Sequence, residues 1–122
     1  AGAGILAMAH AGRHNAPEVL KAGDWILNYG FENYNARQQG WSDDRYHYGV
    51  FHCCQAMYQL GGHYWEEFFP PVARTLVANQ QRDGSWPRDS HGHDRPFGST
   101  YTTSLMVLSL GAPNQLLPIF QR

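Results

Sequence analysis

Apolar side chains recur with helical spacing in five segments of this chain. The segments cover about residues 4–11, 17–29, 46–60, 70–80 and 99–110. Within residues 17–29 the apolar positions return every three or four residues, which is typical of a helix with one buried face. The alternation with period two that marks a strand does not extend over any useful length. The pattern therefore predicts an all-α fold.

Capping and helix-breaking residues set the ends that we expect for these helices. Asn15 is the expected N-cap of the second helix, and Pro17 suits its first turn. Gly61 follows the third helix and is expected to end it. The pair Pro70 and Pro71 is expected to open the fourth helix, because proline is tolerated in a first turn and breaks a helix interior.

Apolar and amphipathic helices alternate along the chain. The first, third and fifth helices are largely apolar and are expected to be buried, whereas the second and fourth have one polar face. Gly12, Gly61 and Gly111 follow the three apolar helices and are separated by 49 and 50 residues. A period of this length is typical of stacked helix pairs. We expect the apolar helices to form an inner layer and the amphipathic helices an outer one.

A sequence motif follows the fourth helix. Residues 76–86 fit the pattern Leu-x3-Gln-x3-Gly-x-Trp, in which the last three fixed positions are Gln80, Gly84 and Trp86. The motif resembles the QW repeat of squalene and oxidosqualene cyclases and the related loop of protein prenyltransferase β subunits. Residues 46–86 and 117–122 also resemble the C-terminal part of uncharacterised bacterial proteins with prenyltransferase- and squalene cyclase-type repeats. The resemblance covers residues 12–122.

The resemblance implies an α/α toroid, in which inner helices ringed by outer ones enclose a central cavity. The QW motif has a structural role in that family, so Gln80 is expected to cap the outer helix and to stack near Trp86. About two and a half repeats make only a partial ring. We therefore expect residues 1–122 to be one partial toroid domain, completed by the remainder of a longer chain or by other copies in a homo-oligomer.

The resemblance also implies catalytic motifs against which the chain can be compared. Cyclases of this family protonate an alkene with the middle aspartate of a D-x-D-D motif, and the nearest segment in this chain ends in Asp43 and Asp44. These two residues are weak catalytic candidates, because capping of the third helix explains them as well. The D-x-C zinc motif of prenyltransferases is absent. Whether the protein is an enzyme therefore stays open at this stage.

Polar side chains form a stripe on the third and fifth helices and are the candidates for lining the cavity. If the apolar helices face a cavity, the stripe lines it together with aromatic rings, which suit an apolar, isoprenoid-like ligand. In the other interpretation the stripe is hydrogen-bonded within a packed core. The candidates are His47, Tyr48, His52, Gln55, Gln59 and Thr102.

The sequence thus favours a terpenoid cyclase- or prenyltransferase-like domain that binds, and in one version transforms, an apolar ligand. A non-catalytic helical scaffold for protein interaction is the alternative. His91 and His93 are weak metal candidates, because a His-x-His segment with nearby carboxylates can bind zinc or copper. They lie in a polar loop that explains them equally well, so no metal or other cofactor is expected.

Composition narrows the class of protein further. Nine Lys and Arg against ten Asp and Glu give a net charge of −1, which does not suit a nucleic-acid-binding surface. No apolar run reaches the roughly 18 residues of a membrane span. The only cysteines, Cys53 and Cys54, are adjacent and form no disulfide framework. This favours a reducing compartment and leaves the localisation otherwise unknown.

Overall fold

The described part of the chain is all-helical in the computed structural model, which describes residues 1–34, 45–88 and 94–115. The helices are α1 (Gly2–His10), α2 (Pro17–Leu27), α3 (Tyr46–Leu60), α4 (Gly62–Ala78) and α5 (Gly98–Leu110). Two short 3-10 helices, η1 (Arg95–Phe97) and η2 (Ala112–Asn114), flank α5. The described ranges contain no strand, so the predicted fold class is confirmed as far as all-α.

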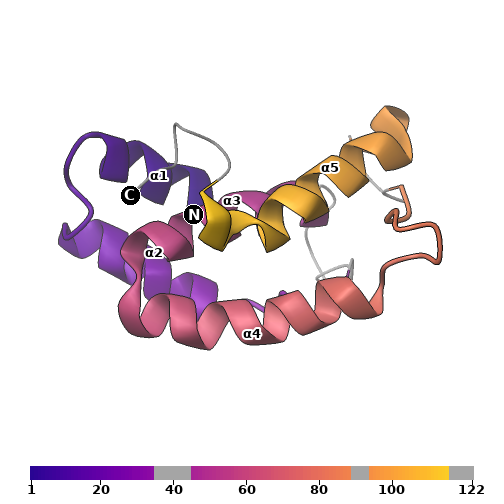
Figure 1. The fold of residues 1–122 in the computed structure, drawn as a ribbon. Coiled ribbons are helices and arrows are strands. Elements are labelled where there is room, and N and C mark those ends of the chain that lie inside the picture. Colours follow the sequence, from indigo (N-terminus) through magenta and orange to yellow (C-terminus); the bar gives the residue numbers. More distant parts are fainter. Residues whose placement is uncertain (35–44, 89–93, 116–122) are drawn as a thin grey trace.

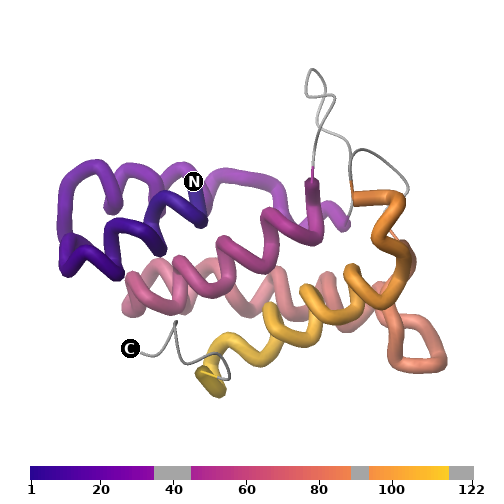
Figure 2. Tube along the Cα trace, turned by 90° about the horizontal axis from the view of Figure 1, so that it is seen from above, coloured from indigo at the N-terminus to yellow at the C-terminus, as the bar shows by residue number. Residues whose placement is uncertain are grey.

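The helices form two layers. α1, α3 and α5 make an upper layer, and α2 and α4 lie beneath it (Figure 1). Viewed from above, α1, α3 and α5 run side by side in the same direction, while α2 and α4 run the opposite way (Figure 2). α3 packs against α1 on one side and α5 on the other, and it also rests on α4. It is therefore the central element of the fold.

Burial explains why α3 occupies this position. Eight of its fifteen residues are buried, including Val50, Cys54 and Met57, whose side chains are fully enclosed. A helix that is apolar on most sides is most stable where neighbours cover most of its surface. The partly exposed residues of α3 lie along one edge near Tyr48 and His52 and in its last turn, residues 58–60.

The expectation that the first helix is buried on all sides is wrong. Within α1 only Gly2, Ile5 and Leu6 are buried, and Ala3 and Ala7 are exposed. The reason is its place at the edge of the upper layer, where α2 and α3 cover one side of it. An apolar composition predicts that a helix can be buried. The number of helices packed around it decides what fraction of its surface is buried.

The predicted start of the fourth helix is also wrong. α4 begins at Gly62 and continues through Pro70 and Pro71, which lie inside it. An interior proline removes a backbone hydrogen bond and costs about 3 kcal/mol. Four buried side chains at a spacing of four residues span both sides of the prolines and stabilise the continuous helix: Tyr64, Phe68, Val72 and Leu76.

The other predicted helices agree with the structure to within about two residues at each end. The third helix begins and ends as predicted, with Gly61 at its C-terminal end. The predicted N-cap of α2 is wrong, because Ala16 occupies that position and no side chain caps the helix. Pro17 is the first residue of α2, as expected.

One glycine allows the two layers to approach closely. Gly23, in the middle of α2, faces Leu60 of α3 and Tyr64 of α4. A Cβ atom at this position would lie 2.8 Å from Leu60 Cδ1 and 2.8 Å from Tyr64 Cε1. The Tyr64 ring is held by hydrogen bonds from its hydroxyl to Leu20 O (3.3 Å) and Asp24 Oδ1 (3.1 Å). The absence of a side chain at Gly23 therefore sets the distance between α2 and the other helices.

Candidate functional site

An ion pair connects the N-terminal ends of α3 and α5. Arg45, the residue before α3, donates through Nε to Asp94 Oδ1 at 2.9 Å, and its Nη2 lies 2.7 Å from the same oxygen. The Asp94 side chain is fully buried, whereas that of Arg45 is 38% exposed. The hydrogen bond to Asp94 raises the pKa of the Arg45 guanidinium above its ordinary value. The pair holds the beginnings of two neighbouring helices together.

A tyrosine completes this ion-paired cluster. The Tyr101 hydroxyl lies 3.5 Å from Arg45 Nη2 and 3.5 Å from Asp94 Oδ2. Burial raises the pKa of Tyr101, and the neighbouring Asp94 carboxylate raises it further. The phenol therefore stays neutral at ordinary pH. Because Arg45 neutralises Asp94 and Tyr101 is neutral, the cluster carries little net charge.

Aromatic rings continue this cluster along the exposed edge of α3. The Arg45 guanidinium lies over the Tyr48 ring, 4.2 Å from its centroid. The His52 ring is 4.1 Å from the Tyr48 ring, and its Nδ1 is 3.0 Å from Tyr48 O. Phe51 meets His52 edge to face at 4.9 Å. Tyr48, Phe51 and His52 are each partly exposed, and together they form what we call the aromatic edge of α3.

His47 lies away from this edge, inside the protein. Its Nε2 is 2.9 Å from the Tyr34 hydroxyl, and its ring meets Tyr34 and Tyr46 edge to face at 5.5 and 5.4 Å. The side chain is completely buried. His47, one of the residues predicted from the sequence to line a cavity, therefore lies in the protein interior.

The other polar candidates lie mostly between helices. Gln55 is 4% exposed and donates from Nε2 to Leu108 O of α5 at 3.1 Å. Thr102 is fully buried, with Oγ1 3.1 Å from Trp86 O and 3.0 Å from Ser99 O. Gln59 is partly buried near the end of α3. Within the described residues, no buried side-chain nitrogen or oxygen lacks a hydrogen-bond partner.

The residues of the QW motif meet at the C-terminal end of α4, with a different hydrogen bond from the one expected. The buried Trp86 indole donates from Nε1 to Leu76 O at 2.8 Å, so this indole, rather than Gln80, binds a carbonyl of the last helical turn. Gln80 Nε2 instead donates to Gly84 O at 2.8 Å, across the loop. Gly84 has φ +85°, a conformation that favours glycine.

Trp86 also joins α4 to α5. Its backbone N–H donates to Thr103 Oγ1 at 3.0 Å, and its carbonyl accepts from Thr102 Oγ1 at 3.1 Å. The indole therefore binds one helix while the backbone of the same residue binds the next. This arrangement gives the motif residues a structural role in the described part of the chain.

No family model, curated protein or solved structure matches this chain. Function is therefore inferred from the residues themselves. None of the helices in the described ranges combines the length with the apolar character that a membrane span requires.

Two pairs of candidates lie outside the described residues. Asp43 and Asp44 belong to the range 35–44, and His91 and His93 to the range 89–93. Among the residues that the structure does describe, no three His, Cys, Asp or Glu side chains are grouped in a way that could hold a metal ion.

The two cysteines are buried, free thiols in the middle of α3. Burial raises the pKa of Cys53 to about 12. Burial also raises the pKa of Cys54, and the neighbouring Cys53 adds to that effect. A thiol reacts or binds metal as the thiolate, so neither residue is poised for such chemistry at neutral pH.

Sequence reasoning missed Arg45, Asp94 and Tyr101. Arg45 and Asp94 are 49 residues apart, which equals the spacing of Gly12 and Gly61 from which the sequence predicts stacked helix pairs. In an array of stacked helix pairs, residues one period apart occupy equivalent places in neighbouring repeats and lie side by side. Opposite charges also lie 50 residues apart at two other places, Asp24 with Arg74 and Glu32 with Arg82, which form no ion pair in the described residues. The spacing alone therefore does not single out Arg45 and Asp94.

Proposed function

We propose that this chain is part of an α/α array of the terpenoid cyclase and prenyltransferase type, and that its upper layer binds an apolar, isoprenoid-like ligand. The observation that carries the proposal is the aromatic edge of α3. There Tyr48, Phe51 and His52 stay partly exposed on the central helix, next to side chains of the same helix that are fully enclosed. Exposed aromatic surface at one place is typical of an interaction site.

Contacts between residues about one period apart support a repeating array. Arg45 and Asp94, 49 residues apart, join α3 to the segment before α5. In the same layer, Gln55 of α3 binds Leu108 of α5, 53 residues later. Gly2 of α1 lies against the backbone of α3 at residues 52 and 53, where an added Cβ would come within 2.9 Å of Cys53 N. Both junctions of the upper layer thus pair segments about 50 residues apart, as stacked helix pairs would.

The charge distribution at the aromatic edge favours an apolar ligand over an ionic one. The Arg45 guanidinium is neutralised by Asp94, and its flat face covers Tyr48. A free anion would have to compete with the Asp94 carboxylate for this guanidinium. The surface next to it consists of the rings of Tyr48, Phe51 and His52. Binding of an apolar group to these rings is favourable, because it removes apolar surface from water.

Binding, rather than catalysis, is the part of this proposal that the described residues support. A cyclase needs a carboxyl group that can give up a proton to an alkene. Asp94 is the one buried carboxyl in the described ranges, and its Oδ1 is already engaged by the Arg45 guanidinium. If the protein is a cyclase, the acid would be Asp43 or Asp44, or would belong to other repeats of the array.

Native mass spectrometry of the purified protein tests the proposal. We expect a complex with an apolar small molecule, either co-purified or formed on adding squalene. A prenyl diphosphate, which is anionic, should bind more weakly than squalene. The variant Phe51→Ser should lower the bound fraction severalfold. Val77→Ser is the matched control, because Val77 is an exposed apolar residue on α4 of the other layer. A protein that binds none of these compounds, or a Phe51→Ser variant that binds as well as Val77→Ser, would overturn the proposal.

A protein-interaction scaffold is the second candidate, and exposed apolar side chains of the lower layer favour it. Trp25 of α2 is 53% exposed and Val77 of α4 is 58% exposed. Large side chains of this kind contribute strongly when a partner covers them. If the scaffold function is correct, Trp25→Ser should abolish partner binding while leaving ligand binding at the aromatic edge unchanged.

A further inference from the structure

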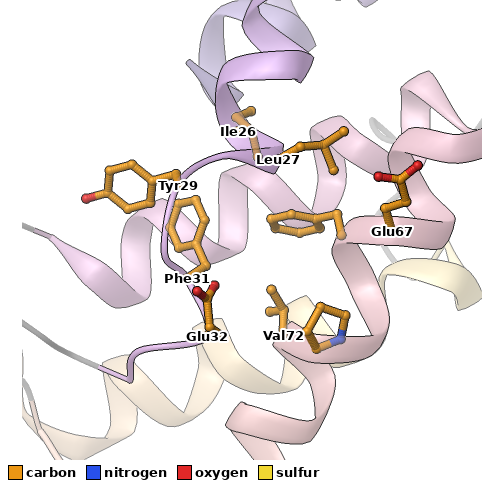
Figure 3. Close-up of a pocket in the computed structure, with 9 residues that line it drawn as sticks. Ile26, Leu27, Tyr29, Phe31, Glu32, Glu67 and Val72 are labelled. Atoms are coloured by element: carbon orange, nitrogen blue, oxygen red, sulfur yellow. The ribbon is translucent and has the colours of Figure 1, made fainter.

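A cleft of about 130 Å³ opens between α2, the loop that follows it and α4. Most of the side chains that line it are apolar, and four of these are buried: Ile26, Phe31, Phe68 and Val72. Two exposed carboxylates, Glu32 and Glu67, belong to the same lining. Figure 3 shows the two carboxylates on opposite sides of the side chains that line the cleft, with Glu32 next to Phe31 and Glu67 on the far side from it. The cleft lies in the lower part of the fold and is separate from the aromatic edge of α3.

Hydrogen bonds hold the loop side of this cleft in place. The Phe31 carbonyl accepts from the buried Tyr46 hydroxyl at 2.8 Å, which ties the loop to α3. The next carbonyl, that of Glu32, accepts from Thr75 Oγ1 at 3.1 Å, which ties it to α4. The side chains of Phe31 and Glu32 therefore start from fixed backbone positions. A site that is already formed avoids the entropy cost of ordering a loop when a ligand binds.

Aromatic rings line the cleft close to the carboxylates. The rings of Phe31 and Phe68 meet edge to face at 5.9 Å, and Tyr29 lies 4.5 Å from Phe31. Ring faces carry negative electrostatic potential and attract cations, and they attract the apolar groups around a cationic nitrogen as well. Glu32 and Glu67 add two negative charges, and neither forms an ion pair with another described residue. The cleft therefore repels anions and favours a cation with an apolar surface.

The size of the cleft limits the ligand further. Pockets for drug-sized molecules usually exceed about 300 Å³, so a volume of about 130 Å³ is too small for an isoprenoid chain. It suits a group of a few heavy atoms. The lining offers a bare metal ion only two carboxylates, which lie on opposite sides of the lining side chains, and the remaining side chains are mostly apolar. This is a poor ligand set for a metal ion. An ammonium nitrogen that carries alkyl groups matches the charge, the walls and the volume together.

We propose that this cleft binds an alkylammonium group, with Phe31 and Phe68 against its alkyl surface and Glu32 and Glu67 balancing its charge. The inference does not depend on the isoprenoid-binding function, because the two sites share no residue. The group can come from a free amine or from a larger molecule, and the chemistry that the cleft recognises is the same in both cases.

A chemical-shift titration of the ¹⁵N-labelled protein with choline tests this proposal at constant ionic strength. We expect saturable shifts of the amides around Phe31, Glu32 and Phe68, and nuclear Overhauser effects from the choline methyl protons to the two phenylalanine rings. The neutral isostere of choline, with carbon in place of the quaternary nitrogen, should bind at least about fivefold more weakly. Butylammonium, a mimic of a lysine side chain, tests a primary amine in the same cleft. If butylammonium binds more tightly than choline, the site is assigned to primary amines such as lysine side chains.

Charge-neutral variants provide the second measurement. Glu32→Gln and Glu67→Gln should each weaken choline binding by about two- to fivefold. Glu66→Gln is the matched control, because Glu66 is the exposed neighbour of Glu67 on α4 and does not line the cleft. All three positions are exposed, so the folded spectrum should be retained. The proposal is wrong if the isostere binds as tightly as choline, if the shifts lie elsewhere, or if Glu66→Gln weakens binding as much as Glu67→Gln.

Discussion

The substitution Trp86→Phe separates the role of the indole N–H from that of the buried ring. Trp86 is 1% exposed, and its Nε1 donates to the buried Leu76 carbonyl at 2.8 Å. Phenylalanine keeps an aromatic ring in the same place but cannot donate this hydrogen bond. It is also smaller than tryptophan and leaves part of the space unfilled. The backbone hydrogen bonds of Trp86 to Thr102 and Thr103 remain available to the variant.

The expected loss of stability follows from these two changes. The Leu76 carbonyl keeps one partner, the Asn79 N–H at 3.1 Å, so it is not left without a hydrogen bond. Losing the indole bond to a buried acceptor should then cost about 1–2 kcal/mol. The unfilled space should cost about 1 kcal/mol more. We expect the free energy of unfolding to fall by about 2–3 kcal/mol in total.

Urea denaturation followed by far-ultraviolet circular dichroism measures this loss. With a slope near 2 kcal/mol per molar urea, the midpoint should fall by about 1–1.5 M while the slope stays unchanged. Trp25→Phe is the matched control, because Trp25 is 53% exposed on α2 and its replacement should change stability by less than about 0.5 kcal/mol. Hydrogen exchange gives an independent measurement, in which the indole N–H of Trp86 should exchange far more slowly than that of Trp25.

Equal midpoints for Trp86→Phe and Trp25→Phe would refute this reasoning. So would fast exchange of the Trp86 indole N–H in the unmodified protein. Either result would mean that the indole does not bind the end of α4. Other groups would then have to hold this helix end, and the QW motif would lose its structural role.

Three further predictions concern helix packing, alkaline stability and the loop after α4. Gly23→Ala should lower the free energy of unfolding by about 1–2 kcal/mol, because the new methyl group would meet Leu60 and Tyr64 at 2.8 Å. Gly4→Ala has open space around the new methyl group and should raise the free energy of unfolding by about 0.5–1 kcal/mol. The urea midpoints of the two variants should therefore move in opposite directions. Stability should fall as the pH rises above about 9, because unfolded thiols release protons there while burial keeps Cys53 and Cys54 protonated in the folded state, with a slope of at most about 1.4 kcal/mol per pH unit for each thiol. Urea midpoints between about pH 8 and 10.5 test this, and the double variant with alanine at both cysteines should show a shallower decline. Gln80→Ala should cost no more than about 1 kcal/mol, since its exposed side chain bonds only within the loop; a loss as large as that of Trp86→Phe would show that Gln80 is the residue that holds the helix end.

Local pattern predicted most of the secondary structure because helices are encoded over short distances. The spacing of apolar residues and the glycine after the helix located α3 with both of its ends. The same local rules failed at α4, where a proline pair normally starts a helix. The spacing of four residues between the buried side chains from Tyr64 to Leu76 is also visible in the sequence, but these side chains stabilise α4 only by packing against α2 and α3. Burial of that stripe outweighed the cost of two interior prolines.

The candidate site could be predicted only in part. The stripe on α3 contains Tyr48 and His52, whose rings lie together because side chains four apart share a helix face. The stripe also contained Gln55, which the structure places against α5 with its hydrogen bond made. Residues on one face of a helix can differ in exposure when a neighbouring helix covers only part of that face. No sequence pattern within α3 reports where the neighbour lies.

The local pattern of residues is enough to predict that the described part of the chain is helical, that apolar and amphipathic helices alternate, and that a tryptophan follows α4 at a fixed spacing. Each of these depends on the identity of residues within a few turns of one another. The packing of the helices is what pairs Arg45 with Asp94, brings the Trp86 indole to Leu76, and places two glutamates beside an aromatic cleft. These pairings join segments brought together by packing. Their strength depends on burial and distance, which a linear pattern of residues does not contain.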